Sequence, residues 1–179
     1  GAISLLNYAN KLPAFILTIL TISIGNVLLP YFSELQFLDS KVIFKKLTNK
    51  LWISFLIGSI CSIFLFLFSE NLISIIFENG LFNQKSSNDV SLVLKMFSLQ
   101  IPFYLMDIIL VRFLTAFNLN KFNVVSSSIS IVINILANYL LITKYGISGI
   151  ALSTSIVYFL SFTVKFIYVY IKFNRKQNN

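Results

Sequence analysis

The chain has 179 residues, of which 57% are hydrophobic and 11% are charged, and its mean hydropathy is +0.85. A soluble domain carries roughly 25% charged residues, so this composition excludes a water-soluble globular protein and indicates an integral membrane protein. The net charge of +8 does not indicate nucleic-acid binding. The cations lie between apolar runs and are not gathered into one basic patch with aromatic residues for stacking on bases.

Five apolar segments are long enough to cross a membrane as helices, since a hydrocarbon core of roughly 30 Å needs about 20 helical residues. They cover about residues 4–31, 51–68, 91–117, 122–143 and 146–171. These runs are too continuous for the strands of a membrane barrel, which alternate over roughly ten residues. The predicted fold class is therefore all-α, a polytopic membrane bundle of about five transmembrane helices.

The first segment carries a single cation, Lys11, in an otherwise uncharged stretch that extends from residue 12 to residue 33. On a helix, Lys11 shares a face with Ala14, Thr18, Thr21 and Gly25, which are small or polar. Charged groups inside a membrane are costly and are functional candidates. This face favours a water-filled cavity, and the alternative is that Lys11 snorkels towards the outer headgroups.

A basic stretch, residues 34–50, follows the first segment and contains four lysines among apolar residues. It is either an amphipathic helix that lies in the membrane interface or a solvated basic loop. The second segment, residues 51–68, is followed by a short apolar tail, residues 72–77, within an acidic loop that extends from residue 70 to residue 89.

The third segment is interrupted by Asp107, close to its middle, and by Arg112. Residues five apart on a helix do not face each other squarely, so Asp107 needs a partner on another helix. Lys11 is the candidate partner, and a purely structural ion pair that locks two helices is the alternative. Lys95 and Lys165 lie near segment ends and are expected to snorkel.

The fourth and fifth segments carry small and polar residues that bring helices close together and form hydrogen bonds between them. One stripe of the fourth segment contains Ser127, Ser130, Asn134 and Asn138, and the fifth segment begins with glycines followed by residues 153–155, Ser-Thr-Ser. Helix packing is the leading interpretation of this pattern. A cavity lining is the second interpretation, and both can hold together.

Catalytic and metal-binding patterns are absent from the sequence. With no histidine, one cysteine (Cys61) in an apolar run and six acidic residues, the chain contains no triad, no metal cluster and no glycine-rich phosphate loop. We therefore expect no enzymatic activity, no metal and no cofactor. A membrane glycosyltransferase or acyltransferase with its active loops elsewhere stays open as an alternative.

The distribution of Lys and Arg predicts the orientation in the membrane, because cytoplasmic loops carry an excess of both. The stretch 34–50, the turn 118–121 and the tail after Ile171 hold four, one and three of them, eight in all. The other side, with the acidic loop and the turn at Lys144, holds two. The basic side and the C-terminus are thus predicted to be cytoplasmic.

Three motifs resemble the MurJ/MviN family of lipid II flippases. The first is YANKL followed by GNVLLPYFSEL, which matches the family's eighth transmembrane helix at Tyr8, Ala9, Leu12, Gly25, Val27, Leu28, Leu29, Pro30 and Ser33. IIFENGLF, residues 75–82, is similar to a family loop, and YGISGIALSTS, residues 145–155, is similar to the start of its twelfth helix. The motifs span nearly the whole chain in the expected order.

The resemblance implies a fold of two six-helix lobes that rock around a central cavity. Residues 1–179 would form part of the second lobe, helices eight to twelve, in a bacterial inner membrane. The start at Gly1 instead of Met also leads us to expect a fragment of a longer protein. The implied function is translocation of a lipid-linked oligosaccharide diphosphate by alternating access, with membrane lipids and a coupling cation as further candidate partners and no nucleic acid.

The candidate substrate-binding residues are Lys11, Asn10, Arg112 and Asp107, and the candidate cavity-lining residues are Thr18, Thr21, Gly25, Asn134 and Asn138. The family's Asp and Arg are Asn10 and Lys11 here, and Lys keeps the charge but loses the bidentate fork of Arg. Glycines expected at Thr18 and Thr21 are absent, and Pro13 is additional. These departures weaken the assignment of lipid II specifically.

Three alternative functions stay open. An exporter of polysaccharide repeat units shares the fold and varies more in this helix. A cation-coupled drug exporter is expected to carry more intramembrane acids than Asp107, and a structural membrane subunit would not need Lys11.

Overall fold

The computed structural model describes residues 2–77 and 84–174 of the chain, and all regular structure in this part is helical. Six α-helices and one short 3₁₀ helix follow one another: α1 (Ala2–Glu34), η1 (Leu35–Phe37), α2 (Ser40–Phe77), α3 (Gln84–Ser98), α4 (Gln100–Ala116), α5 (Asn120–Tyr145) and α6 (Ile147–Asn174). The predicted all-α class is confirmed.

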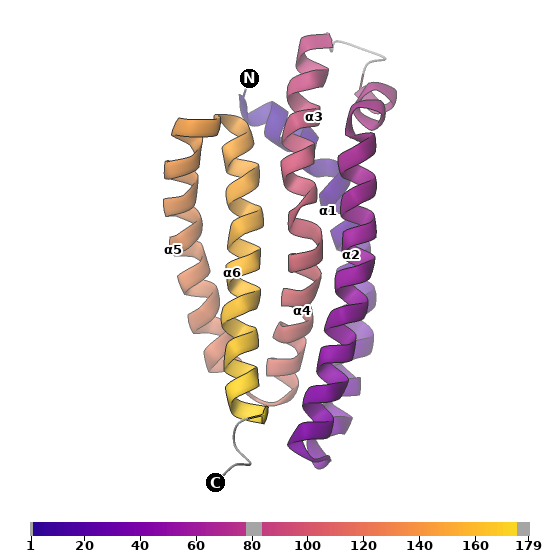
Figure 1. Cartoon of the computed structure of the whole chain (residues 1–179), viewed down its shortest axis with the longest axis vertical. Helices are drawn as coiled ribbons and strands as arrows, with labels where there is room; N and C mark the ends of the chain where they lie inside the picture. The colour runs from indigo at the N-terminus through magenta and orange to yellow at the C-terminus, as the bar shows by residue number, and fades with distance from the viewer. Residues whose placement is uncertain (1, 78–83, 175–179) are drawn as a thin grey trace.

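Five stretches of these helices are long and apolar enough to cross a membrane, as predicted, with α3 and α4 together forming one of them, Ser87–Ala116. Figure 1 shows the helices aligned along the long axis, with the start of α1 and the end of α6 at opposite ends of the bundle. An odd number of crossings requires this arrangement, so the fold agrees with the predicted number of spans.

The basic stretch after the first segment is neither a loop nor a separate interfacial helix. From Ser40 it is already part of α2, which continues through Phe77 and so includes the predicted apolar tail. At 1.5 Å per residue, 38 residues extend about 57 Å, which exceeds the roughly 30 Å of the hydrocarbon core. The lysine-rich first turns of α2 are thus an extension of the second span.

The predicted acidic loop is shorter than expected, because Glu70 lies within α2 and Asp89 within α3. The motif IIFENGLF begins at the end of α2, and its residues from Glu78 onward lie outside the described residues.

The third predicted segment is divided at Leu99, between α3 and α4. Pro102 explains the break, because proline has no N–H to donate to the carbonyl four residues earlier, that of Ser98. Turns were expected at residues 118–121 and at Lys144, and the structure has them close by, at residues 117–119 and at Gly146. Asn118 (φ 58°) and Gly146 (φ 59°) occupy the left-handed region there, which glycine and asparagine adopt most readily.

Helix α4 is the centre of the bundle and α5 is its periphery. Eleven of the 17 residues of α4 are buried, whereas Ser126 is the one buried residue of α5. We call the end of the bundle with the lysine-rich start of α2 the basic end. There, the centroid of the Phe113 ring lies 5.2 Å from that of Phe32 and 5.1 Å from that of Phe173. Large aliphatic and aromatic side chains remain exposed on the outside of α1, α2 and α5, as expected for helices that contact lipid.

Candidate functional site

A first polar cavity of about 540 Å³ lies between α1, α4 and α6. Each of the three helices contributes polar groups to it: Asn10, Thr18 and Thr21 from α1, Gln100 and Tyr104 from α4, and Thr154 and Tyr158 from α6. The spacings of three and four within each helix place these groups on one face. Asn10, Thr18 and Thr21 thus lie where the predicted polar face of α1 meets the rest of the bundle.

A second polar cavity of about 520 Å³ lies between α4, α5 and α6. Its lining includes Asp107 and Lys165 together with the serine stripe of α5, Ser127 and Ser130, and with Asn134. Thr154 and Tyr158 line both cavities, so these two side chains separate them. The Tyr158 ring is held edge-to-face against Tyr104, with 4.9 Å between the ring centroids.

A buried ion pair between α4 and α6 lies at the border of the second polar cavity. The Lys165 ammonium donates to both carboxylate oxygens of Asp107, at 2.8 and 3.0 Å, and to the hydroxyl of Ser161 at 2.8 Å. Ser161 in turn donates to Asp107 Oδ1 at 2.9 Å. The side chains of Lys165 and Asp107 are 2% and 12% exposed, so both charges are removed from solvent and compensate each other.

Two sequence-based expectations about these charges are wrong. Asp107 pairs with Lys165 and not with Lys11, and Lys165 does not snorkel, since it is almost fully buried. The structural ion pair that was kept as the alternative is the one observed. Lys165 was missed because its position near a segment end suggested the interface. The serine four residues earlier, on the same helix face, was the signal that could have identified it.

Lys95 also has a partner that the sequence did not indicate. Its ammonium donates to Glu70 Oε1 at 2.7 Å and links the last turn of α3 to α2. Lys95 therefore does not simply extend towards the headgroups as expected.

Lys11 is exposed, and its ammonium lies 4.6 Å from the centroid of the Tyr8 ring on the preceding turn of α1. It does not line the first polar cavity, although the adjacent Asn10 does. Lys11 is thus the sequence neighbour of a lining residue and not itself part of the lining.

Arg112 lies across Gly25 of α1. A Cβ atom at Gly25 would be 2.9 Å from a terminal nitrogen of the Arg112 guanidinium, so a side chain there would require the guanidinium to shift. The Nε of Arg112 is buried and has no hydrogen-bond partner within the described part of the chain. Gly25 was expected to line a cavity, and in the structure it is buried beneath Arg112 and is not part of the lining of either polar cavity.

The two asparagines of α5 take different positions. Asn134 lines the second polar cavity, whereas Asn138 donates to Asn134 Oδ1 at 2.9 Å and accepts a hydrogen bond from Ser153 of α6. Asn138 is therefore a contact between α5 and α6 and is not part of the lining of this cavity.

The described residues include no group of three or more His, Cys, Asp or Glu side chains that could hold a metal ion. What the arrangement offers is a pair of polar cavities inside an apolar bundle, with an internally neutralised ion pair and two further cations, Lys11 and Arg112. Such a site suits the passage of a polar or anionic group through a membrane, because hydrocarbon alone would exclude that group.

Comparison with known proteins identifies the family. The family model of the lipid II flippase MurJ matches residues 1–178. A protein of Rickettsia prowazekii (strain Madrid E) described as a probable lipid II flippase MurJ is 29% identical over 157 residues, which are 87% of this chain and 31% of that protein.

A solved structure of the lipid II flippase MurJ in an inward closed conformation superposes with a TM-score of 0.80 at 25% identity. The match covers 94% of this chain and 36% of that structure, so the chain spans about a third of the length of the proteins it resembles. The match of the family model over nearly the entire chain confirms the resemblance seen in the three motifs, and the chain belongs to the lipid II flippase MurJ family.

Proposed function

We propose that this chain forms part of the second lobe of a flippase that moves a lipid-linked oligosaccharide diphosphate across the bacterial inner membrane by alternating access. Lipid II is the leading substrate. The observation that carries this proposal is the first polar cavity, about 540 Å³ in volume, in a chain whose family is that of the lipid II flippases. No catalytic step is part of the proposal.

In this proposal the polar face of α1 contacts the sugar and diphosphate headgroup. Lys11 and Arg112 flank this face. Lys11 lies 14 residues before Gly25, the residue that Arg112 covers, which corresponds to about 21 Å along a helix. Thr18 and Thr21 offer hydrogen-bonding groups between these two cations, and Asn10 offers another beside Lys11 in the sequence. Asp107 is assigned a positioning role, because its charge is already balanced by Lys165.

A cation-coupled drug exporter is the less favoured function. Such a protein needs an intramembrane acid that is free to bind a proton or a cationic drug, and Asp107 is bound on both oxygens by Lys165. An exporter of polysaccharide repeat units stays the closest alternative to lipid II, because Lys11 attracts any diphosphate. A coupling cation is retained in the proposal without assigned residues.

The proposal is tested by replacing Lys11 in the full-length protein and measuring growth of cells depleted of their own flippase. If Lys11 binds the diphosphate, Lys11→Gln removes a charge-assisted contact of about 1.5–3 kcal/mol, a roughly ten- to hundredfold loss in affinity. Lys11→Arg should retain function, because the charge is kept.

Lys144→Gln is the matched control, since Lys144 also lies over a tyrosine ring, that of Tyr145, but lines neither polar cavity. Membrane levels of all variants are measured by immunoblotting. Full growth with Lys11→Gln at a normal membrane level would refute the role of Lys11.

We also propose that the C-terminus and the lysine-rich start of α2 are cytoplasmic, on the basis of the eight-to-two distribution of Lys and Arg. Single cysteines at Lys46 and Lys144 in a Cys61→Ser background should react with an impermeant thiol reagent from opposite sides. Only Lys144→Cys should be labelled in intact cells, and labelling of Lys46→Cys there would overturn this orientation.

A further inference from the structure

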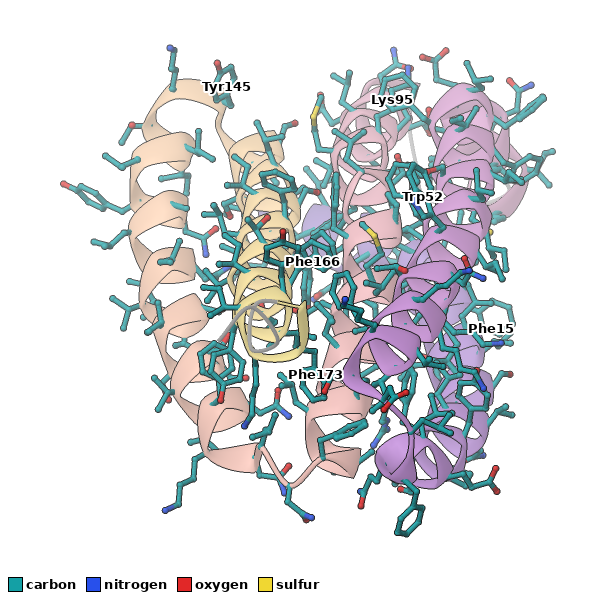
Figure 2. The ribbon with its side chains drawn as sticks, turned by 60° about the horizontal axis from the view of Figure 1, so that its bottom comes forward. Phe15, Trp52, Lys95, Tyr145, Phe166 and Phe173 are labelled. Atoms are coloured by element: carbon teal, nitrogen blue, oxygen red, sulfur yellow. The ribbon has the colours of Figure 1, made fainter. Side chains whose placement is uncertain are left out.

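An apolar crevice runs between α2 and α6, on the side of α4 that faces away from the polar cavities. Two adjoining cavities of about 230 and 450 Å³ form it, and both are lined by Phe55. We call it the aromatic crevice, after its lining residues Trp52, Phe55, Phe103, Phe159, Phe162 and Phe166. Figure 2 shows Trp52 on α2 and Phe166 on α6.

The crevice exists because α2 and α6 both pack on α4 and meet each other mainly at the basic end. Gly58 lets α2 approach α4 closely, since a Cβ atom at this position would be 2.6 Å from the Cα of Pro102. At the basic end the ring of Phe44 contacts Phe166 and Tyr170 of α6, with centroid distances of 6.1 and 5.7 Å, and closes the crevice. Between this contact and Leu152, the crevice is open to the surface of the described bundle.

The lining specifies an apolar occupant. Its polar side chains are a few hydroxyl groups, of which Thr48 already donates to the carbonyl of Lys45 and Ser155 to that of Met96. Apolar cavities of this size stay free of water and accept hydrocarbon ligands. In a bilayer the hydrocarbon that reaches such a crevice is a lipid acyl chain.

The basic end of the crevice specifies the headgroup. Lys41 and Lys45 precede Thr48, Trp52 and Phe55 at spacings of three and four, so both lysines continue the lining stripe of α2. Both are exposed, and no acidic residue occurs from Lys41 to Ile63. Trp52 is 64% exposed at the mouth of the crevice, a position typical of tryptophan at the membrane interface.

We propose that the aromatic crevice binds an anionic glycerophospholipid of the bilayer, with an acyl chain between α2 and α6 and the phosphate at Lys41 and Lys45. The site is separate from the polar cavities and does not rest on the proposed transport function. Each lysine near an anionic headgroup strengthens binding about fivefold. The two lysines together therefore give the anionic lipid at most a roughly 25-fold higher affinity than a zwitterionic lipid with the same acyl chains.

Trp52 is the sole tryptophan of the 179-residue chain and reports directly on the crevice. The complete chain is reconstituted into phosphatidylcholine vesicles that contain a minor fraction of either brominated phosphatidylglycerol or brominated phosphatidylcholine. Bromine quenches tryptophan fluorescence on contact. We expect brominated phosphatidylglycerol to quench Trp52 at a mole fraction about tenfold lower than brominated phosphatidylcholine requires.

Two controls distinguish binding in the aromatic crevice from general electrostatic attraction of anionic lipid to the basic end. Lys41→Gln/Lys45→Gln should abolish the preference, whereas Lys46→Gln/Lys121→Gln, which removes the same charge from the same end of the bundle, should retain it. In a Trp52→Phe background, Ile60→Trp places the tryptophan on a 68% exposed position of α2 outside the crevice, where no preference is expected.

Equal quenching by the two lipids would overturn the proposal. A preference that survives Lys41→Gln/Lys45→Gln would also overturn it, as would an equal preference at Ile60→Trp, since either result assigns the effect to the basic end as a whole.

Discussion

The two sides of α4 differ in what they require of the sequence. One side presents Gln100, Tyr104 and Asp107 to the polar cavities, and the other presents Pro102, Phe103 and Met106 to the aromatic crevice. On the polar side, each buried group needs a partner, and Asp107 is satisfied by Lys165 and Ser161. On the apolar side no pairing is needed, and the volume and closeness of the side chains decide the structure.

This difference predicts that single substitutions act by different mechanisms on the two sides. On the polar side the cost comes from an unpaired charge or donor, so a second substitution can relieve it. On the apolar side the cost comes from steric overlap or lost contact, which a second polar change does not relieve.

The largest effect is expected at the buried ion pair. Asp107→Leu leaves the Lys165 ammonium buried without its counter-charge and should lower the free energy of unfolding by about 3–5 kcal/mol. The double variant Asp107→Leu/Lys165→Met should recover most of this loss, since neither charge remains. Equilibrium unfolding of the purified chain in detergent measures both values. A double variant as unstable as the single one would show that the pair does not act as described.

An intermediate effect is expected at Gly58, on the apolar side. In Gly58→Ala the new Cβ meets the backbone of Pro102, which cannot move aside, so we expect a destabilisation of about 1–3 kcal/mol. Gly25→Ala is the matched substitution on the polar side. Its Cβ meets the movable end of Arg112, and the helix propensity of alanine offsets up to about 1 kcal/mol.

The same unfolding measurement compares the two glycine variants. The account predicts that Gly58→Ala is the less stable protein by at least about 1 kcal/mol, because backbone does not yield as a side chain does. The opposite order would mean that Arg112 is fixed over Gly25 more firmly than α2 is fixed on α4.

The smallest effect is expected between α5 and α6. Ser153→Ala removes the hydrogen bond to Asn138 and should cost about 0.6 kcal/mol, a typical value for a bond between membrane helices. Ser128→Ala is the control, because this exposed hydroxyl bonds only to the Val124 carbonyl of its own helix. If the two variants have the same free energy of unfolding, the hydrogen bond of Ser153 to Asn138 does not stabilise the protein.

Sequence patterns predicted the number of spans and, to within a few residues, the positions of two turns, because hydropathy and turn residues are local properties. They did not predict that α2 is continuous from Ser40, since lysine lowers local hydropathy while remaining a good helix former. The division of the third span was also missed, although Pro102 carried the information for it.

The candidate site was predicted in part. The polar face of α1 follows from residue spacing, and Thr18 and Thr21 do line the first polar cavity. The partner of Asp107 is 58 residues away in the sequence, so it depends on how α6 rotates against α4, which a single sequence does not specify. The aromatic crevice was not predicted, because phenylalanine is equally common in a core, at a lipid face and in a groove.

In the proposed function, the headgroup of a lipid-linked oligosaccharide passes along the polar side of α4 and not along its apolar side. A photoreactive amino acid placed at Thr18, in the first polar cavity, or at Ile156, in the aromatic crevice, distinguishes the two paths. The full-length protein carrying either residue is reconstituted with lipid II and irradiated, and adducts are detected through the labelled sugar headgroup. The account predicts an adduct from Thr18 and none from Ile156. An adduct from Ile156 without one from Thr18 would contradict it.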